Sequence, residues 1–410
     1  MRHDIAQHAL AHMSRRKALK TIGAAGAAAA VATNLGTFAN AGAQAPSSGA
    51  PSSGAPTSGK PDTSNFNDDM FDWEAVISGA WAPGPYGADD QRGTYNEVTA
   101  ASTAAALSML DPTKPVKTYN LGAEMFNGFP AFPSEPPRLH DMFLYVLGNK
   151  MPDDFTAGGG IQASLDPIGA NLVAANEERF AENFTLQIAT QIDGLNHVGV
   201  GPIFYNGNDI REIGTPTGTS RLGNENMGPI VTTGHIIDVL GLKVEQGASD
   251  TFFTAPNGNP SLNGDYRVTV EDIESAMRRQ NAHTSDINKG DVVLYHTGWH
   301  ELHKDDPDTY LGAEPGPWLA ETKFMASKKP AIVGSDTWGY EVLAHPLNDD
   351  GIAFPCHQIL LVKEGIRIGE SILTTELVND GVYKFVFMSS PENIPGATCA
   401  STPPVGLANA

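Results

Sequence analysis

Six short runs rich in β-branched and aromatic residues alternate along this 410-residue chain with segments of helical periodicity. Each run is bounded by Gly, Pro or Asp, which is typical of buried strands. Thr269, followed by Asp272 three residues later, predicts the start of a helix. The mixture of strands and helices favours an α/β fold. We predict strands at 116–121, 184–188, 236–240, 292–296, 331–334 and 382–388, and helices at 95–110, 270–280 and 318–328.

The first 64 residues have a different composition from the rest. Arg15 and Arg16 precede an apolar, Ala/Gly-rich run from Ile22 to Phe38, which predicts a twin-arginine signal peptide over 1–43. Because this run is short for a membrane span, we expect cleavage after Ala41 or Ala43 rather than a retained anchor. The Pro/Ser/Gly-rich repeat in 44–64 predicts a flexible linker. We therefore expect one large domain, 65–410, exported to the periplasm by the twin-arginine translocase.

The charge of the chain excludes some classes of partner. The precursor carries a formal charge of −21, and the predicted signal peptide is basic, so the exported part is more acidic still. Such a surface is repelled by phosphate backbones and by anionic lipids. We expect no nucleic-acid partner and no stable membrane association. The two cysteines, Cys356 and Cys399, fit no zinc-finger spacing, and whether they form a disulfide stays open.

Polar side chains recur on one face of the predicted strand that begins at 184. In an extended strand, Gln187, Gln191 and Asp193 share one face while apolar residues occupy the other. His197 follows a turn that contains glycine and can fold back over this row. The competing interpretation is a solvated strand face.

A second stretch of interest begins at His357 and ends at Glu370. His357 opens an apolar, helix-like run, and Glu370 closes a β-like segment, so both are candidate ligands or acid/base groups. A helix-capping histidine and a surface glutamate are the alternative. His296 or His300 could replace a missing metal ligand, although a structural role is the more common one for such histidines. His235 is expected to be structural. The loops 126–137 and 252–263 are expected to wall a pocket, with an aromatic lining from Phe126, Phe129, Phe132, Tyr205 and Trp299.

An ordered set of motifs carries a resemblance to a known family. The set consists of Tyr119–Pro133, Thr190–His197, Phe204–Gly207, Gly290–Trp299, Val333–Trp338, His357–Leu361 and Pro395–Thr398. In this order it resembles the cyclase family of metal-dependent hydrolases, which includes kynurenine formamidase and isatin hydrolase. The resemblance implies a swivelling β/β/α domain that assembles as a homodimer or homotetramer.

The resemblance also implies roles for individual residues. Asp193, His357 and Glu370 match metal ligands of the family, and His197 matches its catalytic histidine. The chain departs from the family at the two signature histidines, which are replaced by Gln187 and Gln191. In addition, Ala189 stands where the family has glycine, and the spacing from His357 to Glu370 is one residue longer than expected.

These departures change the expected metal content. An amide oxygen is a weaker ligand for zinc than an imidazole nitrogen. We therefore expect one divalent ion, held by Asp193, His357 and Glu370 with Gln187 and Gln191 as further ligands. Manganese and zinc are the first candidates, and magnesium and calcium remain open.

Together these features predict an exported, metal-dependent hydrolase of a small molecule. The expected reaction cleaves a carbon–nitrogen bond in a formamide or cyclic amide, with a metal-activated water and His197 as general base. The alternatives are a lactone hydrolase or cyclase/dehydratase of the same family, and a non-catalytic binding protein on the same fold. Serine-nucleophile, phosphate-binding and dinucleotide motifs do not occur in the contexts that they require.

Overall fold

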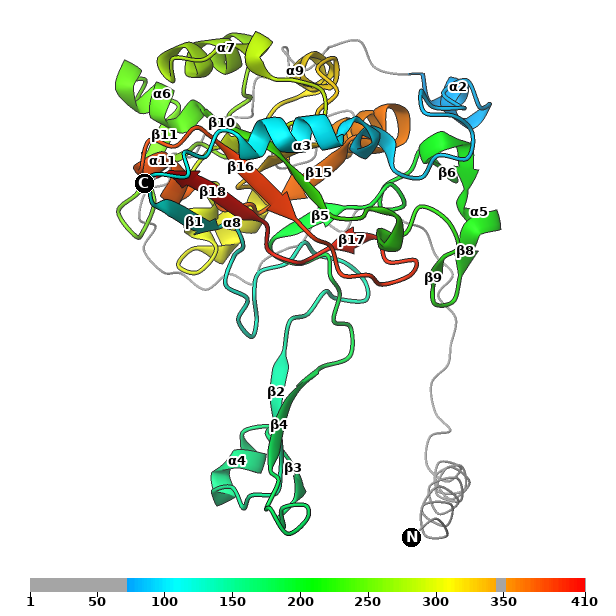
Figure 1. The fold of residues 1–410 in the computed structure, drawn as a ribbon, viewed down its shortest axis with the longest axis vertical. Coiled ribbons are helices and arrows are strands. Elements are labelled where there is room, and N and C mark those ends of the chain that lie inside the picture. The colour runs from blue at the N-terminus through cyan, green and yellow to red at the C-terminus, as the bar shows by residue number, and fades with distance from the viewer. Residues whose placement is uncertain (1–71, 344–351, 410) are drawn as a thin grey trace, which may run out of the picture. The chain divides into compact units, whose positions relative to one another are not determined.

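A nine-stranded sheet forms the centre of the computed structural model, which describes residues 72–343 and 352–409 (Figure 1). The predicted signal peptide and linker lie outside the described residues. The four strands β10, β13, β14 and β15 are parallel, and antiparallel strands flank them on both sides. In order across the sheet, the strands are β1 (Val116–Asn120), β18 (Val405–Asn409), β16 (Lys384–Ser389), β10 (Ile230–Asp238), β13 (Val292–His296), β14 (Ile332–Ser335), β15 (Arg367–Glu370), β5 (Gln191–Asp193) and β17 (Cys399–Ala400).

Both faces of the sheet are buried, so its central strands are apolar on each side. Along β13, Val293 and Tyr295 pack in one core, whereas Val292 and Leu294 pack in the other. The first core is shared with α6 (Val239–Gln246), α7 (Val270–Arg279), α9 (Leu319–Ala326) and the π-helix η7 (Gln358–Glu364). The second includes residues of η2 (Gly93–Glu97) and α11 (Thr375–Asn379). This architecture confirms the predicted α/β fold.

No helix in the described part of the chain is long and apolar enough to cross a membrane.

Shorter elements connect these layers. The remaining elements are α2 (Trp73–Ile77), α3 (Ala100–Leu107), β6 (Ile203–Phe204), η3 (Tyr205–Gly207), β7 (Asn208–Asp209), α5 (Ile210–Ile213), β8 (Gly214–Thr215), β9 (Gly218–Thr219), η4 (Asn224–Asn226), η5 (Thr284–Asp286), η6 (Trp299–Leu302), α8 (Pro307–Gly312) and α10 (Pro355–His357).

Most predicted elements are present, with shifted ends. The strands predicted at 116–121, 292–296, 331–334 and 382–388 correspond to β1, β13, β14 and β16. The predicted helix start is also correct, because Thr269 and Asp272 form a capping box at α7. The helix predicted at 95–110 is divided into η2 and α3, since Thr99 caps a new helix. The strand predicted at 236–240 stops at Asp238, whose side chain caps α6.

Two predicted segments are wrong. Residues 184–188 form no strand: Phe184 makes a single bridge to Leu139, and Ala189 has the left-handed φ of 61° that ends any extended run. Such a conformation costs a residue with a Cβ about 1–2 kcal/mol, so a glycine would adopt it more readily than Ala189. The loop predicted at 252–263 contains a hairpin of β11 (Phe252–Thr254) and β12 (Pro260–Leu262). The loop 126–137 is free of helix and strand, as predicted.

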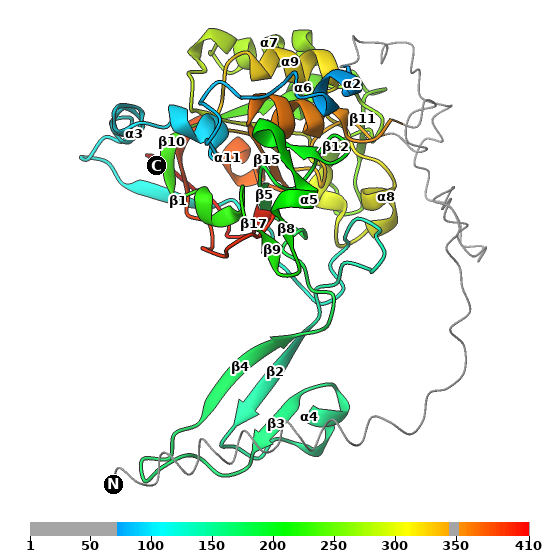
Figure 2. The ribbon, with the colours of Figure 1, turned by 90° about the vertical axis from the view of Figure 1, so that its right-hand side faces the viewer.

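A second sheet, which the sequence analysis missed, is formed by residues 142–180. Its strands pair only with one another, in the order β3-β2-β4. Figure 2 shows this segment, here called the arm, extending away from the nine-stranded sheet. The arm consists of β2 (Met142–Leu147), α4 (Asp153–Ala157), β3 (Ile161–Ser164) and β4 (Ala175–Phe180).

Candidate metal centre

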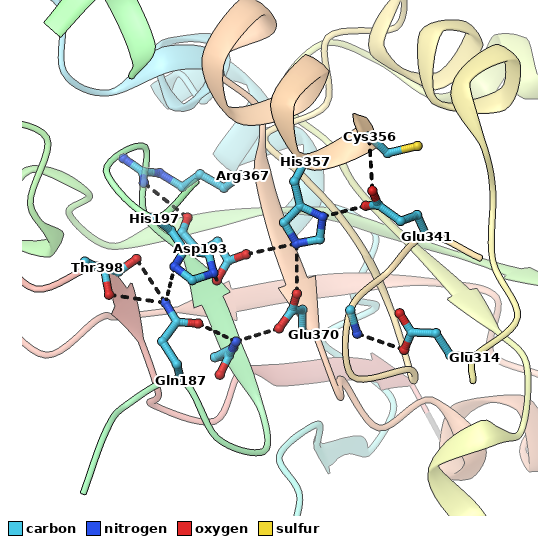
Figure 3. A network of polar contacts seen from close by, with 12 residues as sticks. Gln187, Asp193, His197, Glu314, Glu341, Cys356, His357, Arg367, Glu370 and Thr398 are labelled. Carbon is cyan, nitrogen blue, oxygen red and sulfur yellow. Dashed lines mark hydrogen bonds and ion pairs between the residues drawn. The ribbon is translucent and has the colours of Figure 1, made fainter. Parts of the chain in front are cut away.

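The candidate ligands meet where β5 and β15 pair. In this antiparallel pair, Gln191 stands opposite Glu370, and Asp193 lies two residues further along the same face of β5. His357 ends the short helix α10 and points at the same spot. As a result, ligand atoms of Asp193, His357 and Glu370 lie within 4.8 Å of one another, all buried (Figure 3). The sequence-predicted triad is therefore brought together.

The spacing of these atoms suits one cation. Nε2 of His357 lies 3.1 Å from Oε1 of Glu370 and 3.7 Å from Oδ2 of Asp193. Ligand atoms that are ~2.1 Å from a common ion are about 3.0–3.5 Å apart. The three atoms thus need only small movements to bind one divalent ion.

The carboxylate of Asp193 provides the strongest evidence for a cation. This side chain is fully buried, and neither of its oxygens accepts a hydrogen bond. Burial, with a further contribution from Glu370, raises the pKa of Asp193 well above its usual range. A buried carboxylate that accepts no hydrogen bond is costly, and a bound cation offsets that cost. The residues present therefore fit a metal ion.

Glu341 supports His357 from behind, and sequence reasoning did not find it. Oε2 of Glu341 lies 2.5 Å from Nδ1 of His357, and its Oε1 accepts a hydrogen bond from the backbone N–H of Cys356. Burial acts to lower the pKa of His357, but Glu341 and Glu370 together raise it well above its usual value. A carboxylate that accepts from Nδ1–H directs Nε2 toward a metal, as in many metalloenzymes.

The longer spacing between His357 and Glu370 has a structural counterpart. The residues that follow His357 form the π-helix η7 (Gln358–Glu364). A π-helical turn takes up more residues than an α-helical turn and often occurs at functional sites. The extra residue is thus accommodated in η7, and both side chains still reach the centre.

The two glutamines form a directional chain of hydrogen bonds. Nε2 of Gln191 donates to Oε2 of Glu370 at 2.5 Å and to Oε1 of Gln187 at 2.7 Å. Because Oε1 of Gln187 is used in this way, its Nε2 faces Nδ1 of His197 at 3.0 Å. Oε1 of Gln191 is buried and accepts no hydrogen bond, whereas Nε2 of the same amide faces Glu370.

His197 completes the site at its more open side. Since Gln187 donates to Nδ1, the imidazole proton lies on Nε2, which is 4.0 Å from Oδ1 of Asp193. Burial, together with the charge of His357, lowers the pKa of His197 to about 3. The ring is therefore neutral near pH 7.

A further buried acid, Glu314, lies beside the centre (Figure 3). One of its oxygens accepts the backbone N–H of Gly339, and the other has no partner. Burial raises the pKa of Glu314 well above its usual range, and repulsion by Glu370 adds to the shift. Glu314 was not predicted, because its sequence context shows no ligand motif.

The loop 126–137 covers the centre, whereas much of the expected aromatic lining lies elsewhere. Phe129 and Phe132 line a narrow cavity of about 20 Å³ that also contacts Gln187, Gln191 and Glu370. A wider cavity of about 520 Å³ lies over β16 and β18 and touches none of the ligand residues.

Three predicted pocket aromatics lie away from this cavity. Tyr205 is buried with its hydroxyl on Asp90, and Trp299 is buried against Tyr310, so both belong to the core. Phe126 packs on His303 instead. The glycines and polar residues next to these three aromatics in the sequence are typical of a pocket. The aromatic side chains themselves pack in the core or on His303.

The other histidines and the cysteines are separate from the ligand cluster. His296 contacts Thr374 and Asp336, and His300 stacks on His303. His235 pairs with Asp291 and is structural, as expected. Cys356 and Cys399 are buried free thiols with no bridge between them, and burial raises the pKa of both well above the usual thiol value.

Comparison with known proteins identifies the family of the chain. The sequence pattern of the Cyclase family, described as "Putative cyclase", matches residues 119–342, more than half of the chain. The chain belongs to the Cyclase family. The matched range contains β5 and the Gln187–His197 segment, and membership indicates a cyclase or hydrolase enzyme.

Solved structures are similar to this Cyclase family member to different degrees. A crystal structure described as a novel cyclase is 26% identical, with a TM-score of 0.60 over 79% of this chain and 98% of its own. Isatin hydrolase A from Ralstonia solanacearum is 16% identical, with a TM-score of 0.48 over 75% of this chain and 97% of its own. Isatin hydrolase A from Labrenzia aggregata is 14% identical, with a TM-score of 0.46 over 77% of this chain and 99% of its own. No curated protein sequence matches the chain.

Metal binding should depend on Asp193 and, to a smaller degree, on Glu341. We expect Asp193→Ala to weaken binding of a divalent ion by at least ~100-fold, and Glu341→Gln to weaken it by about 10–100-fold. Titration calorimetry measures the affinity of each variant for the ion, and elemental analysis measures the ion content. The exposed Glu271→Gln on α7 is the matched control and should bind as wild type. An unchanged affinity in Asp193→Ala would remove this residue from the ligand set.

The raised pKa of Glu314 predicts a pH-dependent stability. A native pKa above the unfolded value stabilises the fold at low pH, and this contribution is lost as the pH rises through the native pKa. Glu314→Gln keeps a neutral side chain at every pH. The Tm of this variant relative to wild type should therefore rise as the pH increases from about 5, measured without metal. A difference that does not vary with pH would contradict a buried, titrating Glu314.

Proposed function

We propose that this chain is an exported, metal-dependent hydrolase that cleaves the carbon–nitrogen bond of a formamide or cyclic amide. The observation that carries the proposal is the fully buried carboxylate of Asp193, which accepts no hydrogen bond, beside His357 and Glu370. A divalent cation bound by this set would compensate its negative charge, and a cation next to a histidine is a recurrent arrangement for hydrolysis. A purely binding pocket has no need for it.

One divalent ion suits the ligands that are present. Asp193, His357 and Glu370 would hold it, and Gln191 can add its Oε1 as a fourth ligand once its amide turns over, because Nε2 now faces Glu370. Gln187 is proposed as a further ligand only if it gives up the hydrogen bond from Gln191. Manganese or zinc fits this mixture of oxygen and nitrogen ligands, and magnesium or calcium is the alternative. When bound, the ion supplies electrophilic polarisation of the substrate carbonyl and lowers the pKa of a water.

His197 is the proposed general base, and Gln187 positions it. With Gln187 donating to Nδ1, the Nε2 atom of His197 carries a proton and cannot accept another. If the amides of Gln187 and Gln191 turn over together, the oxygen of Gln187 can accept from Nδ1–H of His197, and Nε2 of His197 is left free. His197 can then take a proton from water at Nε2 and return it to the leaving nitrogen.

The loop 126–137 must move to admit a substrate. The cavity of about 20 Å³ beneath Phe129 and Phe132 is far smaller than the pockets that hold drug-sized ligands, roughly 300 Å³ or more. Arg138, at the end of this loop, donates to the backbone oxygen of Gln187 and lies over the ring of Phe132. We propose that the loop opens for binding and then closes to exclude water during the reaction.

Export by the twin-arginine route remains part of the proposal, since a folded chain can acquire its ion before it reaches the periplasm. The Arg15-Arg16 pair and the Ala/Gly-rich run after it support this. The family name favours a second candidate, a cyclase/dehydratase reaction at the same centre. A lactone hydrolase would use the same centre, and a non-catalytic binder would keep the fold alone.

Panels of formamides, cyclic amides and matching lactones should separate these candidate functions. His197→Ala, assayed on the same panels, tests the role of His197. We expect turnover of an amide to fall by about 10²–10⁴-fold, with unchanged ion content and Tm. His283→Ala, an exposed histidine outside the site, is the control. Turnover equal to wild type would exclude His197 from the mechanism. Activity confined to lactones would favour the lactone hydrolase, and no turnover of any panel member would favour the binding protein.

Restoring the family's two histidines should change the metal content. We expect wild type to bind one zinc ion per chain, and Gln187→His/Gln191→His to bind two, because imidazole is the stronger zinc ligand. Elemental analysis after dialysis against zinc measures the stoichiometry without any activity assay. Gln187→Asn/Gln191→Asn is the control and should stay at one ion or fewer. Two tightly bound ions in wild type would contradict the single-ion proposal.

A further inference from the structure

Arg138 is the only Arg or Lys among the described residues that line the narrow cavity over the candidate metal centre. It shares this cavity with Gln187, Gln191 and Glu370 of the centre. The chain has a formal charge of −21, so its surface in general repels small anions. A guanidinium at this position opposes that repulsion locally. The cavity therefore contains a group that can select a ligand by its charge.

Most of the hydrogen-bonding capacity of Arg138 is not used by the protein. Its Nη1 donates to the backbone oxygen of Gln187 at 3.3 Å, and its guanidinium carbon lies 5.6 Å from the ring centroid of Phe132. In the part of the chain that the structure describes, the other guanidinium nitrogens donate to no acceptor, and the side chain forms no ion pair. Because the guanidinium donors form a planar fork, Arg138 can still bind a carboxylate in bidentate fashion.

The backbone directly after Arg138 is anchored. Leu139 forms a bridge with Phe184, and its N–H donates to the backbone oxygen of Asn183 at 3.3 Å. The next residue, His140, is buried. Arg138 therefore lies at the anchored end of the loop that covers the centre. We expect it to keep its place when this loop opens, and to face the entering substrate.

The positive charge of Arg138 acts on the groups of the centre. Burial is the largest cause of the lowered pKa of His197, and the charges of His357 and Arg138 add to it. Burial and Glu370 raise the pKa of Asp193, whereas His357 and Arg138 oppose this shift. Since Arg138 and Glu370 also line the same small cavity, one small molecule can contact both the guanidinium and the metal centre.

We propose that Arg138 binds a carboxylate of the substrate and so makes the enzyme selective for amides that carry this group. This inference rests on the proposed function, because it assigns the substrate class of the same centre. The carboxylate would lie in the fork of Arg138, beside Phe132, and would take no part in the cleavage of the carbon–nitrogen bond. A carboxylate suits the single guanidinium better than a phosphate, which enzymes usually hold with several positive groups.

The kinetic test compares the ortho, meta and para formamidobenzoates with their methyl esters, which keep the formamide and lack the charge. For wild type, we expect kcat/KM of at least one acid to exceed that of its ester by about 10–100-fold, mainly through KM. Arg138→Gln should abolish this preference. Arg138→Lys should keep part of it, because lysine retains the charge without the planar fork. A merely structural role of Arg138 would change kcat/KM of acid and ester alike, and their ratio would not move.

Binding of benzoate to the ion-loaded mature protein gives a readout without turnover. In calorimetry, Arg138→Gln should raise the benzoate Kd by about tenfold or more, and it should have a smaller effect on neutral benzamide. Lys304→Gln is the matched control. Lys304 is exposed and lies over the ring of Phe126, next to the same loop, but it does not line the cavity. Its replacement should leave the acid-to-ester ratio and the benzoate Kd unchanged.

The results separate this inference from the proposed function. Equal kcat/KM for acids and esters in wild type, or a ratio that Arg138→Gln leaves unmoved, would overturn the role of Arg138 and leave the hydrolase in place. If no formamide is hydrolysed but benzoate binding still depends on Arg138, the proposed reaction fails and the carboxylate-binding role stands. A benzoate Kd that depends on the ion and not on Arg138 would place the carboxylate on the metal and overturn the inference.

Discussion

The buried carboxylate of Asp193 is the constraint on which the rest of the site depends. It lies at the centre of a group of acids, with Glu370 beside it and with Glu341 and Glu314 further out, and it accepts no hydrogen bond. Protein interiors tolerate such groups only when a proton or a cation compensates them. In this chain the compensating groups are few, because Arg367 donates to the backbone oxygen of Asp193 rather than to its carboxylate.

Backbone hydrogen bonds near the edge of the sheet fix the position of Asp193. β5 has only three residues, yet it is held between β15 and β17. Directly after it, the N–H of Gly194 donates to the backbone oxygen of Thr398 at 2.7 Å, and a Cβ at this position would come within 2.7 Å of that oxygen. A glycine is therefore required for the close approach. This contact links a segment near residue 193 to the C-terminal part of the chain and keeps the carboxylate under the ring of His357.

The sequence predicts the framework of the fold well, because hydrophobic periodicity and capping residues act locally. Thr269 with Asp272 and the apolar run Val292–His296 are examples, and the ordered family motifs extend this to Asp193, His357 and Glu370. Long-range partners are not encoded in any local pattern. Glu341 and Glu314 were missed for this reason, since each matters only through the residue that it meets in space. The arm was missed because β4 is exposed along its whole length, and β2 and β3 together bury a single hydrophobic side chain, that of Val146.

Each of the two free thiols adjoins a residue of the candidate metal centre. Cys356 precedes the ligand His357, and Cys399 pairs with Asp193 across β5 and β17. Both are enclosed by the folded chain. In an unfolded chain that entered an oxidising compartment, these two cysteines would be free to couple and to tie the halves of the site together wrongly. If the chain folds before export, as proposed, both sulfurs are already shielded when it reaches that compartment, and the site is protected from its own cysteines.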